Sequence, residues 1–454
     1  MNLVDQIKIL YESRLFVDVK LATSIVLTMS EHNEELLTPT VKYQMLAFQG
    51  EAFHETGEYR RAEVVLVKAL QMRKMIHKVK GKTQALDIPT EVDVKYLLHL
   101  CHCLLQQHKE ALSVLEGVSS KQRTAKINMA LAKLYQRMGQ DRSAVTAYKE
   151  VLRQCPMSLE AARGLMALGV KSAEVSALMM VCLPGGSTSE WLCTWIKGQG
   201  LAASREFVPA TQMLRALDAK PLLRDNEDLL LSIGEACFQN GDYTEAQATL
   251  QRAHALDPLL LERMDVLAFL LAREKKIKEL ESLALQMMSV SEDAAQPWVA
   301  MGYLCLDTKK ATRAVYFAQK AQRLDTTSLM AILLKGMALQ KLNRLTDAGM
   351  YFREAIRLAP HQYEAYKGLV DCLQANRRNR EAIAIAGQAC KQVGMNPRSF
   401  TLYASVLAKE PLSLEKAKTY LERAVKMDGS HLDTVYLLAD ILLQQQQYDK
   451  GIEL

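Results

Sequence analysis

A spacing of 34 residues between small side chains constrains the fold of this chain more than any other feature. Glycines stand one or two such steps apart at Gly234, Gly302 and Gly336. Alanines keep multiples of the same step in two further series, namely Ala246, Ala314, Ala348 and Ala382, and Ala253, Ala321, Ala355 and Ala389. Small side chains are needed at fixed positions where two helices cross closely, so the pattern predicts a repeated pair of packed helices.

A period of 34 is typical of the tetratricopeptide (TPR) helix–turn–helix repeat. The clearest unit runs from residue 329 to residue 362. Its first helix, helix A, carries Gly336, the turn lies near Asn343, and its second helix, helix B, carries Ala348. Pro360 cannot continue helix B and closes the unit. We therefore expect an all-α fold, an α-solenoid superhelix of TPR repeats.

The N-terminal part of the chain repeats the pattern less regularly. Its small residues at the expected positions are Gly50, Ala62, Ala69, Ala132 and Ala144. Residues 159–226 are helical in character but fit the template poorly. We expect N-terminal TPR repeats in residues 1–158, off-template helical repeats joining the two arrays in residues 159–226, and a C-terminal TPR superhelix in residues 227–454.

Three places depart from regular repetition. Residues 77–91 and the stretch Pro184-Gly185-Gly186-Ser187 predict loops. The last repeat stops at Leu454, inside its second helix near Tyr448. We expect that the sequence is truncated within this repeat and that further repeats follow in the complete protein.

Composition excludes several classes of protein. Hydrophobic residues make up 49% of the 454 residues, which is enough for a continuous core. A net charge of +6 over this length is weak evidence for a nucleic-acid partner. The nine cysteines are odd in number and scattered, which favours reduced thiols in the nucleus or cytosol. The charged N-terminus and the absence of an apolar run near about 20 residues predict neither a signal peptide nor a membrane segment.

No sequence motif for catalysis is present. Phosphate-binding loops, nucleophile elbows, zinc-protease motifs and kinase signatures are all missing, so we predict no catalytic residue, cofactor or metal ligand. The densest His/Cys cluster comprises His99, Cys101, His102, Cys103 and His108. Neighbouring residues of a helix point in different directions, so these side chains are not expected to face one ion. The basic runs at residues 73–82, 273–278 and 377–380 predict solvated segments, with contacts to an acidic partner as the alternative.

The inner face of a TPR array is lined by helix A, at the second, fifth, sixth and ninth positions of each unit. In the C-terminal array the groove candidates are Gln296, Val299, Tyr303, Leu333, Met337, Lys367 and Asp371. Co-chaperone TPR domains clamp a terminal carboxylate with Lys, Arg and Asn at these positions, and the regular units here lack that set. The mixed, partly apolar lining suits an extended peptide or a protein surface.

The non-repetitive stretches carry a more specific signal than the repeats. The N-terminal residues 1–66, the stretch PGGSTSEWLCTWIKGQG at residues 184–200, and the regular units after residue 227 together resemble one family. It is the seventh-subunit family of the anaphase-promoting complex, or cyclosome, whose members are TPR subunits of a large ubiquitin ligase that controls mitotic progression.

This resemblance implies a set of partners. TPR subunits of that assembly form two-fold homodimers through their N-terminal repeats, and their C-terminal superhelix docks on the other TPR subunits. Some sister subunits also receive Ile-Arg tails of the coactivator in their groove. Catalysis belongs to cullin and RING subunits, so the resemblance implies a non-catalytic scaffold. It also implies a location in the nucleus and cytoplasm and allows one at the spindle.

Two other classes of function fit a TPR array. The first is a peptide-binding adaptor or co-chaperone, which predicts binding of a short acidic peptide, although the clamp residues are missing. The second is the repeat arm of a modifying enzyme, such as a glycosyltransferase, with a catalytic domain after Leu454. The sequence of the complete C-terminus would discriminate between the scaffold and the enzyme, because more repeats favour the scaffold and an α/β domain favours the enzyme.

Overall fold

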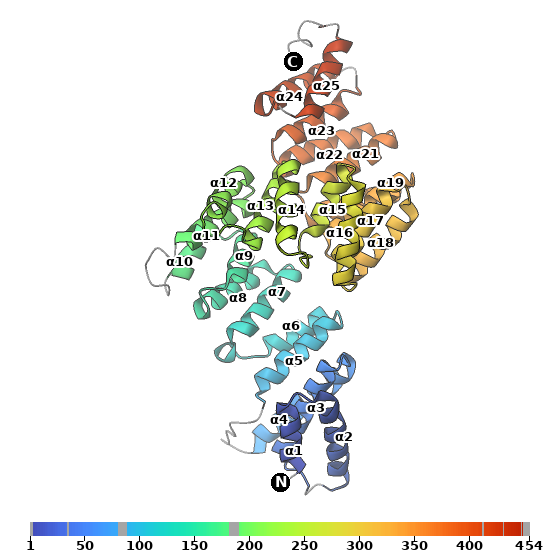
Figure 1. Cartoon of the computed structure of the whole chain (residues 1–454). Helices are drawn as coiled ribbons and strands as arrows, with labels where there is room; N and C mark the ends of the chain where they lie inside the picture. Colours follow the sequence, from blue (N-terminus) through green and yellow to red (C-terminus); the bar gives the residue numbers. More distant parts are fainter. Residues whose placement is uncertain are drawn as a thin grey trace. The chain divides into compact units, whose positions relative to one another are not determined.

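Every regular secondary-structure element in the described part of the chain is a helix. The computed structural model describes residues 3–33, 36–79, 89–180, 190–410, 413–429, 431–445 and 447. These residues form 25 α-helices and one short 3₁₀ helix and contain no β-strand, which confirms the predicted all-α solenoid (Figure 1). Within the same residues, no helix is both long enough and apolar enough to cross a membrane.

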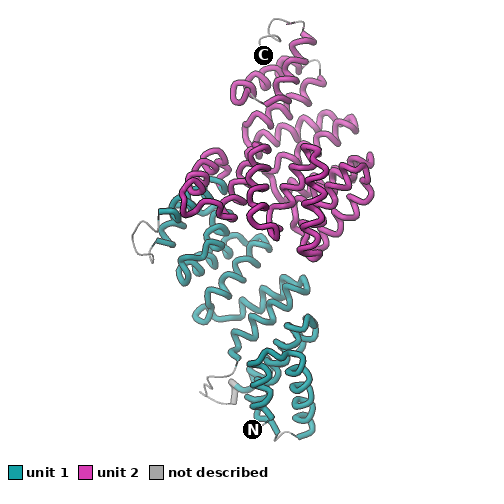
Figure 2. Tube along the Cα trace, viewed as in Figure 1, with its two compact units in different colours: residues 1–203 teal, residues 204–454 magenta. Residues whose placement is uncertain are grey.

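The chain divides into two compact units, residues 1–203 and residues 204–454 (Figure 2). The division falls inside residues 159–226, the segment that fits the repeat template poorly. The predicted loop at residues 184–187 and the end of the last repeat at Tyr448 lie outside the described residues. Residues 80–88 of the loop predicted at 77–91 also lie outside the described residues. At the described ends of that loop the prediction was wrong, because residues 77–79 end one helix and Glu91 begins the next.

Unit 1 is a series of antiparallel helix pairs. Its helices are α1 (Leu3–Glu12), α2 (Phe16–His32), α3 (Pro39–Glu55), α4 (Tyr59–Val79), α5 (Glu91–Leu104), α6 (His108–Glu116), η1 (Ser120–Gln122), α7 (Ala125–Arg137), α8 (Asp141–Gln154), α9 (Leu159–Ala167), α10 (Ser172–Met180) and α11 (Glu190–Ala203).

Unit 2 continues the same arrangement. Its helices are α12 (Phe207–Asp218), α13 (Glu227–Asn240), α14 (Tyr243–Leu256), α15 (Met264–Arg273), α16 (Ile277–Val290), α17 (Ala295–Asp307), α18 (Ala311–Leu324), α19 (Leu329–Lys341), α20 (Leu345–Leu358), α21 (Tyr363–Ala375), α22 (Asn379–Gln392), α23 (Pro397–Leu407), α24 (Leu414–Met427) and α25 (Leu432–Gln444).

Glycines in helix A admit large side chains from the helix that crosses them. A Cβ atom on Gly336 would lie 2.8 Å from the ring of Phe352 in α20, which is closer than real Cβ contacts. The same addition at Gly302 would meet Leu334 at 2.3 Å, because the next repeat packs there. The absence of a side chain therefore sets how closely neighbouring helices approach.

The turn between helices A and B has the same conformation in five successive repeats of unit 2. A left-handed residue recurs at steps of 34, at Gly241, Lys275, Lys309, Asn343 and Arg377. In each case the following N–H bonds back to a carbonyl five residues earlier, as Arg344 does to Leu339 at 2.9 Å. This closure satisfies carbonyls at the end of helix A and reverses the chain toward helix B. Two of the predicted basic runs fall on these turns.

Candidate functional site

The residues predicted to pack the repeats lie in the core. All twelve alanines are fully buried, namely Ala62, Ala69, Ala132, Ala144, Ala246, Ala253, Ala314, Ala321, Ala348, Ala355, Ala382 and Ala389. The four glycines Gly50, Gly234, Gly302 and Gly336 are buried as well. They offer no surface to a partner. Their contribution to function is to fix the positions of the helices whose side chains form that surface.

Unit 2 has a groove of about 920 Å³ that runs along helix A of several successive repeats. Side chains of α15, α17, α19 and α21 line it. These four helices are the helices A of successive repeats, which form the inner face of a TPR array. Phe269 of α15 stacks edge-on against Tyr303 of α17, with ring centroids 5.7 Å apart. These aromatic rings give the groove an apolar floor, flanked by charged side chains.

The groove contains four of the seven predicted residues. Tyr303, Met337, Lys367 and Asp371 line it. Val299 and Leu333 do not line it, and both have no exposed surface. Their prediction as groove residues was wrong, because helix A of each repeat packs against helix A of its neighbours and covers these positions. Gln296 is only partly buried but does not line the groove.

The charges in the groove are mixed, with cations in excess. Its lining cations are Arg273, Lys275, Lys309, Lys341 and Lys367, against the carboxylates Asp307, Glu364 and Asp371. Burial raises the pKa of Asp307, and the nearby Lys275 and Lys341 oppose that rise. Burial raises the pKa of Asp371 as well, and there Lys367 opposes it most.

Two polar atoms in the groove have no hydrogen-bond partner within the described residues. They are the buried Oη of Tyr303 and Oδ2 of Asp307. Burial raises the pKa of Tyr303 well above its ordinary value, so the hydroxyl stays protonated and can donate. A buried donor and a buried acceptor without partners are rare in folded proteins, and together they match the two polar groups of a peptide bond.

Glu364, one of the lining residues of the groove, takes part in a buried ion pair. Nη2 of Arg398 donates to Oε1 of Glu364 at 3.2 Å, and the hydroxyl of Tyr243 donates to the same oxygen at 2.5 Å. Burial raises the pKa of Glu364 and lowers the pKa of Arg398 to about 9, which leaves the guanidinium charged at neutral pH. The guanidinium also lies over the ring of Tyr363, 4.1 Å from its centroid.

Sequence reasoning missed this cluster. Tyr243 precedes Glu364 by 121 residues, and the two meet only because the superhelix of unit 2 turns back on itself. The nearby Gly241 leaves room for Arg398, since a Cβ there would lie 2.5 Å from its side chain. One signal was available: Glu364 and Arg398 have opposite charge and stand 34 residues apart at the second position of successive repeats.

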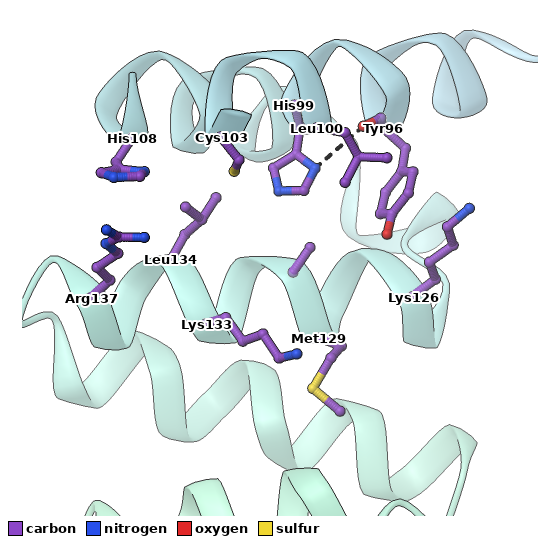
Figure 3. A pocket seen from close by; sticks show the side chains of 11 residues that line it. Tyr96, His99, Leu100, Cys103, His108, Lys126, Met129, Lys133, Leu134 and Arg137 are labelled. Atoms are coloured by element: carbon purple, nitrogen blue, oxygen red, sulfur yellow. Dashed lines mark hydrogen bonds between the residues drawn. The ribbon is translucent and has the colours of Figure 1, made fainter. Parts of the chain in front are cut away.

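Unit 1 has a smaller cleft of about 370 Å³ between α5 and α7 (Figure 3). The His/Cys cluster divides around it. His99, Cys103 and His108 line the cleft, whereas Cys101 is buried elsewhere and burial raises its thiol pKa to about 12. His102 also lies away from the cleft, with Nδ1 at 2.8 Å from Oε1 of Gln107. Among the described residues, no three His, Cys, Asp or Glu side chains converge as a metal ion requires.

Comparison with protein families finds the same repeat and one specific assembly. Residues 375–454 match the family described as anaphase-promoting complex, cyclosome, subunit 3. Residues 333–394, 129–158 and 227–258 match tetratricopeptide repeat families.

Whole-chain relatives are more specific. The chain is 39% identical to anaphase-promoting complex subunit 7 of Homo sapiens, over 100% of this chain and 82% of that protein. It is 26% identical to anaphase-promoting complex subunit 7 of Arabidopsis thaliana, over 99% and 84% of the two chains. A solved structure described as the APC/C hetero-tetramer Cut9–Hcn1 is similar in fold, with a TM-score of 0.64, 16% identity, and coverage of 99% of this chain and 85% of that chain.

Proposed function

The chain belongs to the anaphase-promoting complex subunit 7 family, and on that premise we propose that it is a non-catalytic scaffold subunit of this ubiquitin ligase in mitotic cells. The observation that carries the proposal is the match to subunit 7 along the whole chain. A solenoid suits such a role because its stacked repeats offer long surfaces at fixed curvature, over which many weak contacts add up.

Unit 1 is the part that we propose joins two copies of the chain. Its helix α2 carries a stripe of exposed apolar side chains, namely Val17, Leu21, Ile25 and Met29, which are 46–61% exposed. The opposite face of α2 is buried in the core of unit 1 through Val19 and Val26. A terminal repeat normally presents a polar outer face, so an apolar stripe here indicates a surface that another molecule covers.

A second copy of the chain is the occupant that we propose for this stripe. In a two-fold dimer each copy presents the same patch, so an apolar stripe on one copy is complementary to the stripe on the other. The contact would leave unit 2 of both copies available for other subunits. This homodimer agrees with what the family resemblance implies for residues 1–158.

Unit 2 is the part that we propose docks on other TPR subunits. Its groove offers an aromatic floor, an excess of cations, and an unpartnered donor and acceptor at Tyr303 and Asp307. These features suit an extended, acidic segment of a neighbouring subunit, whose backbone would supply the missing hydrogen-bond partners. We place the protein in the nucleus and cytoplasm and at the spindle, where its partners act.

Isolation of the full chain from cells through a terminal tag tests the proposal. We expect the other TPR subunits of the complex to be recovered with it in a fixed ratio. Lys367→Glu in the groove should reduce that recovery, whereas Lys391→Glu on the exposed surface of α22 should not. Recovery of the chain without these subunits, or with chaperones alone, would contradict the scaffold function.

A further inference from the structure

The cleft between α5 and α7 in unit 1 has a line of positive charge along one wall. Its cations are Lys126, Lys133 and Arg137 of α7, and no carboxylate belongs to its lining. Steps of seven and four residues bring these three side chains to within about 20° of one line on the helix, over about 16 Å of its length. The cleft is therefore a basic channel and not a point-like anion site.

The opposite wall and the floor of the cleft are less polar. Tyr96 and Leu100 of α5 and Met129 and Leu134 of α7 belong to the lining, and Leu134 points toward α5 (Figure 3). The ammonium group of Lys126 lies 3.9 Å from the centroid of the Tyr96 ring, which holds one end of the line of charge in place. A ligand must therefore place apolar groups between the groups that meet the cations.

Two imidazoles line the cleft. Nδ1 of His99 lies 3.3 Å from the carbonyl oxygen of Tyr96, which suits an Nδ1–H donor and leaves Nε2 as an acceptor (Figure 3). Burial lowers the pKa of His99, so the ring is neutral at neutral pH. Nδ1 of His108 is buried and has no hydrogen-bond partner among the described residues. Both nitrogens suit the polar groups of a peptide backbone.

We propose that this cleft binds an extended acidic segment of a protein partner, in which carboxylates alternate with apolar side chains. An extended chain advances about 3.3 Å per residue, so five residues cover about 13 Å, and the length of their side chains makes up the difference from the line of cations. Successive side chains of an extended chain point to opposite faces, so carboxylates at alternate residues lie on one face and can meet Lys126, Lys133 and Arg137 in order. A single phosphate group is too small to contact all three cations, which favours the extended segment.

The cations are free enough to exchange partners. Lys133 pairs with Glu160 at 2.5 Å, but both side chains are more than half exposed, so the pair is weak. Arg137 is exposed and lies beside His108, whose pKa it lowers together with burial. An acidic segment in the cleft would give the Arg137 guanidinium a carboxylate partner. The site is separate from the apolar stripe of α2 and from the groove of unit 2.

Fluorescence anisotropy with a synthetic peptide tests the proposal on the full chain. The probe is a fluorescein-labelled peptide containing Glu-Val-Glu-Val-Glu, and its control replaces each glutamate by glutamine. We expect the acidic peptide to bind, to weaken as salt is raised, and to bind about tenfold more tightly than the control, because three exposed ion pairs contribute. Equal binding of the two peptides would overturn the proposal.

Variants of exposed residues locate the site without threatening the fold. The triple variant Lys126→Ala, Lys133→Ala and Arg137→Ala should weaken the acidic peptide about tenfold, and each single change roughly two- to fivefold. Arg142→Ala, an exposed cation of α8 outside the cleft, is the matched control and should bind like the original chain. Unchanged binding by the triple variant would overturn the proposal. So would a fall of its sedimentation mass to half that of the original chain, because the cleft would then be a contact between copies.

Discussion

Arg398 and Glu364 form a buried ion pair between two successive repeats of unit 2, with Nη2 of the guanidinium 3.2 Å from Oε1 of the carboxylate. Each is the second residue of a helix A, in α23 and in α21, and 34 residues separate them. The hydroxyl of Tyr243 in α14 donates to the same carboxylate oxygen. One carboxylate thus joins three repeats across the interior of unit 2.

Removal of the guanidinium should destabilise unit 2 strongly. We expect Arg398→Met to lower the free energy of unfolding by about 3–5 kcal/mol, because it leaves the buried charge of Glu364 without its partner. Denaturant unfolding followed by circular dichroism measures the change. Combining Arg398→Met with Glu364→Gln removes the unpaired charge and should restore part of the loss.

The matched control for this prediction is an exposed ion pair in the same unit. Arg378, which directly precedes α22, pairs with Glu381 of α22, and about half of each side chain is exposed. Arg378→Ala should lower the free energy of unfolding by less than about 1 kcal/mol. A loss from Arg398→Met no larger than this would show that the buried pair does not hold the repeats together.

Two glycines of one repeat should respond to alanine in opposite directions. In Gly336→Ala the new Cβ meets the ring of Phe352 at 2.8 Å, and we expect a cost of about 1–3 kcal/mol from overpacking. In Gly349→Ala the nearest atom is 3.6 Å away, at ordinary contact distance, so we expect a gain of about 0.4–1 kcal/mol from reduced flexibility of the unfolded chain. Thermal melting compares the two, and shifts in the same direction would contradict this packing.

Stability should depend on pH through Asp265 near the start of α15. Burial raises the pKa of this carboxyl to about 6 in the folded chain, while the Arg263 guanidinium opposes the rise. Because the folded pKa is above the unfolded one, the neutral carboxyl favours folding. Its contribution is fully present below about pH 4 and is lost as the pH rises through about 6.

Asp265→Asn tests this dependence, since asparagine stays neutral and keeps an acceptor for the backbone N–H of Val266. We expect the variant to be more stable than the original chain by up to about 3 kcal/mol above pH 7. The difference should shrink as the pH falls from 7 toward 4. Melting temperatures of the two proteins across this range measure it, and a constant difference would assign the effect to another cause.

The apolar stripe of α2 should determine whether the purified chain is a dimer or a monomer. We expect the original chain to sediment at twice its mass of 50.9 kDa and the double variant Leu21→Glu and Ile25→Glu to sediment as a monomer. Leu104→Glu, at an exposed leucine at the end of α5, is the control and should leave the mass unchanged. If the original chain sediments as a monomer, the proposed self-association through α2 is wrong.

Local features of the sequence predicted the helices but not the surfaces. The 34-residue step located Ala314, Ala348 and Ala382 because crossing helices impose small side chains at fixed positions, and all three are fully buried. The same step gave the turn at Asn343, where the backbone is left-handed. These features depend only on one repeat and its neighbour.

The groove depends on the curvature of the whole array, which the repeat pattern does not specify. Val299 and Leu333 fit the positions of a groove residue, yet neighbouring helices cover them. Tyr303 and Met337 fit equally well and line the groove. The hydrogen bond between Tyr243 and Glu364 joins repeats that are distant in the chain, so no pattern within one repeat predicts it.

Cross-linking mass spectrometry on the complex isolated through this chain tests the proposed scaffold most directly. A cross-link that joins Lys20 to Lys20, or Lys8 to Lys8, arises only between two copies of the chain. The proposed function predicts such links in unit 1, together with links from lysines of unit 2 to other TPR subunits of the complex. Links confined to single copies, with none to another TPR subunit, would contradict it.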